Sequence, residues 1–163
     1  MKKWYLLACL LGLLNSTITF SQIQKIDQST SIKWIEIGKV GGGVTSAFIA
    51  SLSYYREDDT TNTYALVYNN LKYTHITDLK TVIFKASPAE LNSLYESMSQ
   101  QMKAEKGAQS KFVLGKDEVT LATVRNLGVS SLLIYVMQNS VSSYFQITQK
   151  QLDKLFGVKP KEE

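Results

Sequence analysis

The feature that most constrains this fold is a strand-to-helix junction that occurs twice, 61 residues apart. "FKASPAELNSLY" covers residues 84–95, and "FQITQKQLDKLF" covers residues 145–156. In each stretch a Ser or Thr is followed three residues later by Glu or Gln, the capping box that begins a helix. Apolar residues then recur at helical spacing, so each helix has one face that a sheet must cover.

The first junction predicts a long helix over residues 88–106. Ser87 is the N-cap, Glu90 completes the capping box, and Pro88 occupies the favoured first helical position. Gly107 is placed to end the helix. The residues at helical spacing are Leu91, Leu94, Tyr95, Met98 and Met102.

The second junction predicts a short C-terminal helix. Thr148 and Gln151 form its capping box, and Gly157 with Pro160 ends it. Leu152 is apolar at the fourth helical position, where it can pack against a residue that precedes the cap.

Strand signals precede both helices. β-branched and aromatic residues, in places alternating with polar ones, are typical of strands. The predicted strands cover residues 31–40, 44–55, 64–68 and 79–86, then 111–114, 118–125, 131–137 and 141–147.

These elements predict an α+β fold, with a two-layer antiparallel sheet and both helices on one face. The two halves are then predicted to form two similar β-meander-plus-helix units. This likeness fits either a duplication or the demands that any strand-to-helix junction makes.

Residues 1–21 have the order of a secretory signal. Lys2 and Lys3 precede an apolar run over residues 4–14, and small polar residues follow, which predicts cleavage before Gln22. The apolar run is too short to span a bilayer, which needs about 20 residues. An alternative is a lipoprotein signal that ends at Cys9.

The predicted organisation is therefore a signal, a polar leader, one domain and a charged tail. These segments cover residues 1–21, 22–30, 31–158 and 159–163. We expect an exported protein, periplasmic or extracellular, with no transmembrane segment once the signal is removed.

Removal of the signal changes the charge and the cysteine content. Lys+Arg falls from 18 to 16 against 14 acidic residues, so the net charge falls from +4 to +2. The single cysteine, Cys9, leaves with the signal. A weakly basic chain without cysteine argues against nucleic-acid binding, a thiol nucleophile and a cysteine metal site.

Motifs for catalysis or cofactors are weak. His75 is the only histidine, and no nucleophile-elbow pattern accompanies it and Asp78. The glycines of "GKVGGG" (residues 38–43) precede strand periodicity, which favours a turn over a phosphate loop. Asp58 and Asp59 are weak calcium candidates, because the EF-hand spacing is missing. We predict no cofactor and no metal.

Aromatic residues give the best functional indication. Five of the eight tyrosines that follow the signal lie between residues 54 and 73, and Trp34 precedes them. Such rings suit binding surfaces, although tyrosine is also common in half-buried strands. The candidate residues for partner or ligand binding are Trp34, Tyr54, Tyr55 and Tyr73. We expect Tyr55 and Tyr73 to be more exposed than Tyr68.

The function predicted from these features is a non-catalytic binding or accessory module of the bacterial envelope, with a protein or glycan partner. One alternative is a small-ligand carrier with an apolar cavity between sheet and helix. Another is a carboxylate-based hydrolase, which requires two converging carboxyl groups. The candidates for such a pair, Glu36, Asp117 and Glu118, are scattered in the sequence.

Overall fold

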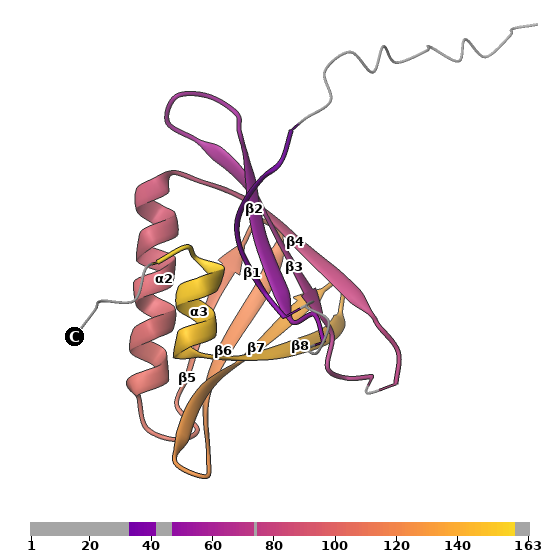
Figure 1. Ribbon diagram of the computed structural model, residues 1–163, viewed down its shortest axis with the longest axis vertical. Coiled ribbons are helices and arrows are strands. Elements are labelled where there is room, and N and C mark those ends of the chain that lie inside the picture. The colour runs from indigo at the N-terminus through magenta and orange to yellow at the C-terminus, as the bar shows by residue number, and fades with distance from the viewer. Residues whose placement is uncertain (1–32, 42–46, 74, 159–163) are drawn as a thin grey trace, which may run out of the picture. The chain divides into compact units, whose positions relative to one another are not determined.

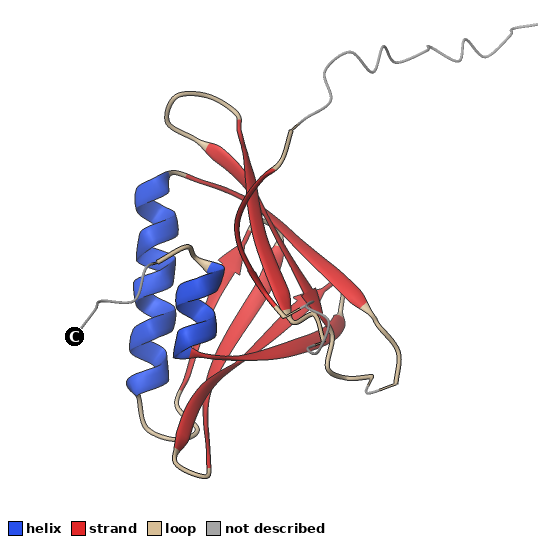
Figure 2. Cartoon of the chain, viewed as in Figure 1, coloured by secondary structure: helices blue, strands red, loops and turns tan. Residues whose placement is uncertain are grey.

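A computed structural model describes residues 33–41, 47–73 and 75–158, as two successive halves (Figures 1 and 2). The first half contains β1 Ile35–Val40, β2 Ala50–Arg56, β3 Asn62–Asn69, β4 Leu79–Ala86 and α2 Pro88–Lys103. The second contains β5 Gln109–Leu114, β6 Asp117–Asn126, β7 Val129–Gln138, β8 Val141–Thr148 and α3 Gln149–Leu155. The predicted signal and its Cys9 alternative, the leader and the tail (residues 1–21, 22–30 and 159–163) lie outside the described residues.

Each half forms its own four-stranded antiparallel sheet in which strand order follows the sequence. We call β1–β4 sheet A and β5–β8 sheet B. The predicted α+β class, with a long helix, a short C-terminal helix and two meander-plus-helix halves, is confirmed. Whether the halves arose by duplication stays a prediction.

The two hairpins of sheet B that flank β7 turn through residues with positive φ. Leu127 and Gly128 connect β6 to β7 with φ values of 48° and 81°. Asn139 and Ser140 connect β7 to β8 with φ values of 48° and 65°, between the strands predicted over residues 131–137 and 141–147. Two consecutive positive φ angles are the type I′ arrangement that matches the twist of the flanking strands.

Both predicted capping boxes form. At α2, the hydroxyl of Ser87 accepts from the amide of Glu90 at 3.2 Å, and the amide of Ser87 donates to the Glu90 carboxylate at 2.7 Å. The bonds that the Ser87 amide and hydroxyl donate to this carboxylate lower the pKa of Glu90 below its ordinary value. At α3, the amide of Thr148 donates to the Gln151 side chain at 2.8 Å.

The long helix ends at Lys103, three residues before the predicted Lys106. Backbone groups that would have formed the next helical turn bond to strand β6 instead. The Arg125 guanidinium donates to the carbonyl of Ala104 at 3.1 Å. The amide of Gly107 likewise donates to a β6 carbonyl at 3.0 Å. Tertiary contacts thus stop the helix before the glycine does.

The core lies between the inner faces of the two sheets and the apolar faces of the helices. The Tyr68 ring of sheet A stacks on Phe145 of sheet B at a centroid distance of 4.7 Å. The helices lie side by side (Figure 1), where the Tyr95 hydroxyl of α2 donates to Asp153 of α3 at 2.9 Å. Each sheet therefore has one buried face and one outer face.

Gly38 allows α3 to approach strand β1 closely. The β1–β2 register shifts between Glu36 and Gly38, which marks a bulge. A Cβ added at Gly38 would lie only 2.0 Å from the carbonyl oxygen of Lys154 in α3. Only glycine fits at this contact.

Candidate binding surface on sheet B

The predicted aromatic residues do not form one patch. Trp34 is exposed and its ring meets Tyr55 edge-on at 5.0 Å, on the outer face of sheet A. The neighbouring Tyr54 points to the opposite face, where it packs against the core. Tyr73 is exposed and follows the far end of β3. The structure brings Trp34 and Tyr55 together and separates both from Tyr54 and Tyr73.

The expected order of exposure among the tyrosines is confirmed. Tyr68 is fully buried, whereas Tyr55 is half-buried and Tyr73 is exposed. The Tyr68 and Ser143 hydroxyl oxygens are 2.7 Å apart, and burial raises the pKa of the Tyr68 phenol above its ordinary value. Tyr68 is therefore a core residue that links the two sheets.

A second aromatic group, which the sequence analysis missed, lies on the outer face of sheet B. Tyr135 of β7 pairs directly with Tyr144 of β8, and their rings are 5.6 Å apart. Met137 follows two residues after Tyr135 on the same face. Tyr135 is 37% exposed and Met137 is 44% exposed. Among the described helices and strands, sheet A and both helices pack on the opposite face of sheet B, where the core lies.

The same face carries a shallow depression and an ion pair. The depression has a volume of about 350 Å³, and its lining includes Thr120, Tyr135 and Met137. The Lys111 ammonium lies 2.9 Å from the Glu118 carboxylate, and both side chains line the depression. Exposed pairs of this kind contribute little to stability, about 0–1 kcal/mol. Polar groups thus border an apolar and aromatic centre.

The β3–β4 connection extends this face. The amide of Leu71 donates to the carbonyl of Tyr144 at 2.8 Å, and the Tyr144 hydroxyl donates back to the carbonyl of Leu71 at 3.3 Å. Tyr73 lies two residues further along this connection. We define the aromatic surface as Leu71, Tyr135, Met137 and Tyr144.

Asn70 fixes the connection against β8. Asn70 is 2% exposed. Its side chain donates to the Asp78 carboxylate at 2.9 Å and accepts from the amides of Lys72 and Tyr144, both at 3.1 Å. The bond from Asn70 and the ion pair with Lys80 at 3.0 Å lower the pKa of Asp78 below its ordinary value. A single buried amide therefore positions one edge of the aromatic surface.

The three candidate carboxyls for hydrolysis do not converge. Glu36 lies on β1 of sheet A, whereas Asp117 and Glu118 are adjacent on β6 and point to opposite faces. Asp117 is buried and accepts from the Gln138 side chain at 2.8 Å. His75 is exposed, while Asp78 is engaged as described. These residues supply no pair of facing carboxyls.

Asp58 serves the β2–β3 loop. Its carboxylate accepts from the amides of Thr60 and Thr61 at 2.8 and 2.7 Å, and these bonds lower its pKa below the ordinary value. Asp59 is exposed beside it. Within the ranges that the structure describes, no three His, Cys, Asp or Glu side chains group as metal ligands. Of the glycine run, Gly41 has a φ of 75°, and residues 42 and 43 lie outside the described part.

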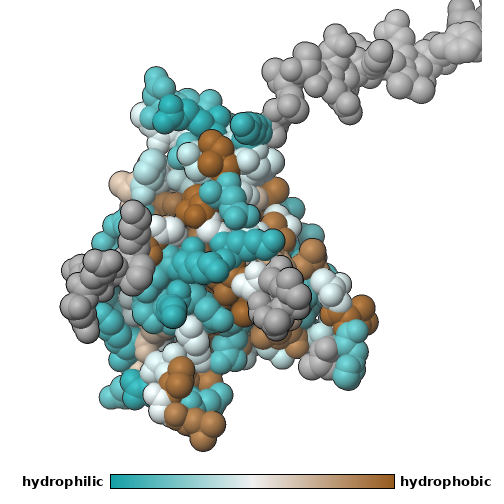
Figure 3. Space-filling view, in the orientation of Figure 1, coloured by the Kyte–Doolittle hydropathy of each residue, from teal (hydrophilic) through white to brown (hydrophobic). Residues whose placement is uncertain are grey.

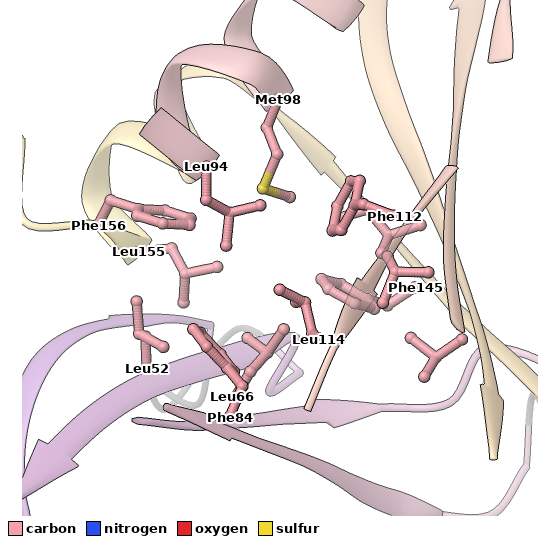
Figure 4. Close-up of a pocket in the computed structure, with 13 residues that line it drawn as sticks. Leu52, Leu66, Phe84, Leu94, Met98, Phe112, Leu114, Phe145, Leu155 and Phe156 are labelled. Carbon is pink, nitrogen blue, oxygen red and sulfur yellow. The ribbon is translucent and has the colours of Figure 1, made fainter. Parts of the chain in front are cut away.

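The space between the sheets and helices is nearly filled. Figure 4 shows apolar side chains converging from both sheets and both helices, including Leu52, Leu94 and Phe145. The cavity that they enclose measures about 20 Å³, whereas ligand pockets typically need about 300–1,000 Å³. This space fits a packed core and leaves no room for a bound metabolite.

Among the described residues, neither helix combines the length and apolarity needed to cross a bilayer.

Comparison with known proteins found no matching family model, no matching curated protein and no matching solved structure.

Proposed function

We propose that this chain is an exported, non-catalytic interaction module of the bacterial envelope that binds a protein partner through the aromatic surface. The observation that carries the proposal is the Tyr135–Tyr144 pair with Met137 on the outer face of sheet B. Export is proposed on the order of charged, apolar and small residues over residues 1–21.

The composition of the surface supports a protein partner. Tyrosine and methionine are enriched at the centres of protein interfaces, where charged residues are depleted, and polar groups form the rim. The aromatic surface has this arrangement, because the Lys111–Glu118 pair lies beside the exposed Tyr135 and Met137. Its backbone is held by β-sheet pairing and by Asn70, so binding would cost little conformational entropy.

The proposal is tested by quantitative pull-down from envelope extract, with the chain that begins at Gln22 as bait. The double variant Tyr135→Ser/Met137→Ser removes the exposed centre of the surface. Ile83→Ser is the matched control, since Ile83 is an exposed apolar residue on the outer face of sheet A.

We expect the double variant to capture the partner at least about tenfold less, because truncating a residue at the centre of an interface typically costs more than 1 kcal/mol of binding free energy. The Ile83 variant should capture as much as the unaltered chain. Equal capture by all three baits would refute the assignment of the aromatic surface.

A further inference from the structure

The hairpin between β6 and β7 extends beyond the rest of sheet B. Ala122 is the last β6 residue that pairs with β5, and Ser131 is the first β7 residue that pairs with β8. At the outer end of the hairpin, Arg125 pairs only with Ser130, and Asn126 pairs only with Val129. Figure 1 shows this hairpin at the bottom of the view, at the same end as the C-terminus of α2.

The end of the hairpin carries apolar side chains in an unfavourable setting. Leu127 is 105% exposed, and Val129, on the other side of the turn, is also exposed. Leu127 has a φ of 48°, a conformation that leucine seldom adopts and that Asn or Gly adopts readily. Figure 3 shows hydrophobic atoms at the lowest point of the molecule, where Figure 1 places this turn. Neither folding nor turn chemistry explains a leucine here.

Basic residues lie in the two chain segments that meet at the base of the hairpin. Lys103 ends α2, Lys106 lies in the following loop, and Arg125 bonds to the carbonyl of Ala104 between them. Glu105 is the one acidic residue in residues 103–108 and 125–130, so three basic groups and one acidic group give this end a net charge of +2. Leu127 follows Arg125 by two residues, which places it about 7 Å further out at about 3.3 Å per residue.

We infer that this hairpin end docks on an anionic lipid surface, with Leu127 and Val129 inserted into the bilayer interface. Apolar groups of interfacial proteins enter about 5–10 Å into the boundary between headgroups and acyl chains. With Leu127 at that depth, Arg125 and the lysines lie at the level of the lipid phosphates. Basic groups near anionic lipids each contribute about fivefold in affinity. This docking does not depend on the aromatic surface.

The test is co-sedimentation with vesicles of pure phosphatidylcholine or of phosphatidylcholine with phosphatidylglycerol. The full chain and the chain that begins at Gln22 are both measured, because the apolar run over residues 4–14 can itself enter a bilayer. We expect about 25-fold tighter binding to the anionic vesicles, from two net charges. Leu127→Asn should reduce this binding about tenfold or more.

Two further measurements distinguish a lost lipid contact from a damaged fold. Asparagine adopts positive φ more readily than leucine, so the thermal midpoint of Leu127→Asn should rise while its vesicle binding falls. Val141→Ser alters an exposed apolar residue at the other β7 hairpin and should bind vesicles normally. The Tyr135→Ser/Met137→Ser variant should also bind vesicles normally, which keeps this test separate from that of the proposed function.

Three results would each overturn the inference: no vesicle binding by the unaltered chain, equal binding to both lipid compositions, or equal loss with Leu127→Asn and Val141→Ser. Undiminished binding by Leu127→Asn would overturn it as well, since the attraction would then be purely electrostatic. Capture of a protein that depends on Leu127, with no vesicle binding, would assign the hairpin to a protein contact instead.

Discussion

Replacing Asn70 with Ala should destabilise the protein and loosen one edge of the aromatic surface. The substitution removes the acceptor for two backbone amides, those of Lys72 and Tyr144. The Lys72 amide lies in an exposed turn where water can replace the bond, but the Tyr144 amide lies in a half-buried strand. One buried amide without a partner costs about 1–3 kcal/mol. We therefore expect a loss of about 2 kcal/mol.

Urea unfolding of the chain that begins at Gln22, followed by the fluorescence of Trp34, measures this loss. A change of about 2 kcal/mol should lower the midpoint by about 1 M. Hydrogen exchange should also accelerate at the amides of Leu71 and Tyr144. Asn92→Ala is the matched control, because Asn92 is exposed on α2 and should change stability by less than about 0.5 kcal/mol. Equal midpoints for the two variants would refute the role given to Asn70.

Three further predictions concern stability. The pKa values of Asp58 and Asp78 are lowered in the folded state, so the stabilisation by these carboxylates is present above about pH 4 and is lost as the pH falls through their folded pKa values. The urea midpoint should therefore be lower at pH 3 than at pH 5, and a constant midpoint would contradict this. Gly38→Ala should cost about 1–3 kcal/mol in thermal unfolding, because its Cβ would clash with the carbonyl of Lys154; an unchanged midpoint would disprove the close contact. Tyr68→Phe should cost about 1 kcal/mol in urea unfolding through the lost hydroxyl bond, and no loss would argue against that bond.

Local chemistry made much of the fold predictable. The capping boxes at Ser87 and Thr148 gave the start of each helix, because their hydrogen bonds join residues only three apart. The turn at Asn139 was predictable for the same reason. The end of α2 was not, since it depends on bonds from β6, a segment about 20 residues away. The division into two sheets likewise depends on contacts between distant segments.

The candidate surface was harder to predict. In "SLLIYVM" (residues 131–137) nearly every residue is apolar, so the alternation of buried Ile134 and Val136 with exposed Tyr135 and Met137 gives no pattern of polar and apolar residues. The separation of Tyr54 from Tyr55 was within reach, because successive residues of a strand point to opposite faces. The link between Leu71 and sheet B was not predictable, because it depends on bonds of Asn70 and Leu71 to Tyr144, more than 70 residues away.

Site-specific photo-crosslinking in cells tests the central claim most directly. A photoreactive amino acid in place of Tyr135 samples the middle of the aromatic surface, and the same group in place of Ile83 samples the outer face of sheet A. We predict one discrete crosslinked protein from the Tyr135 position and none from the Ile83 position. Crosslinks at Ile83 alone, or at neither position, would contradict the claim that sheet B carries the partner-binding surface.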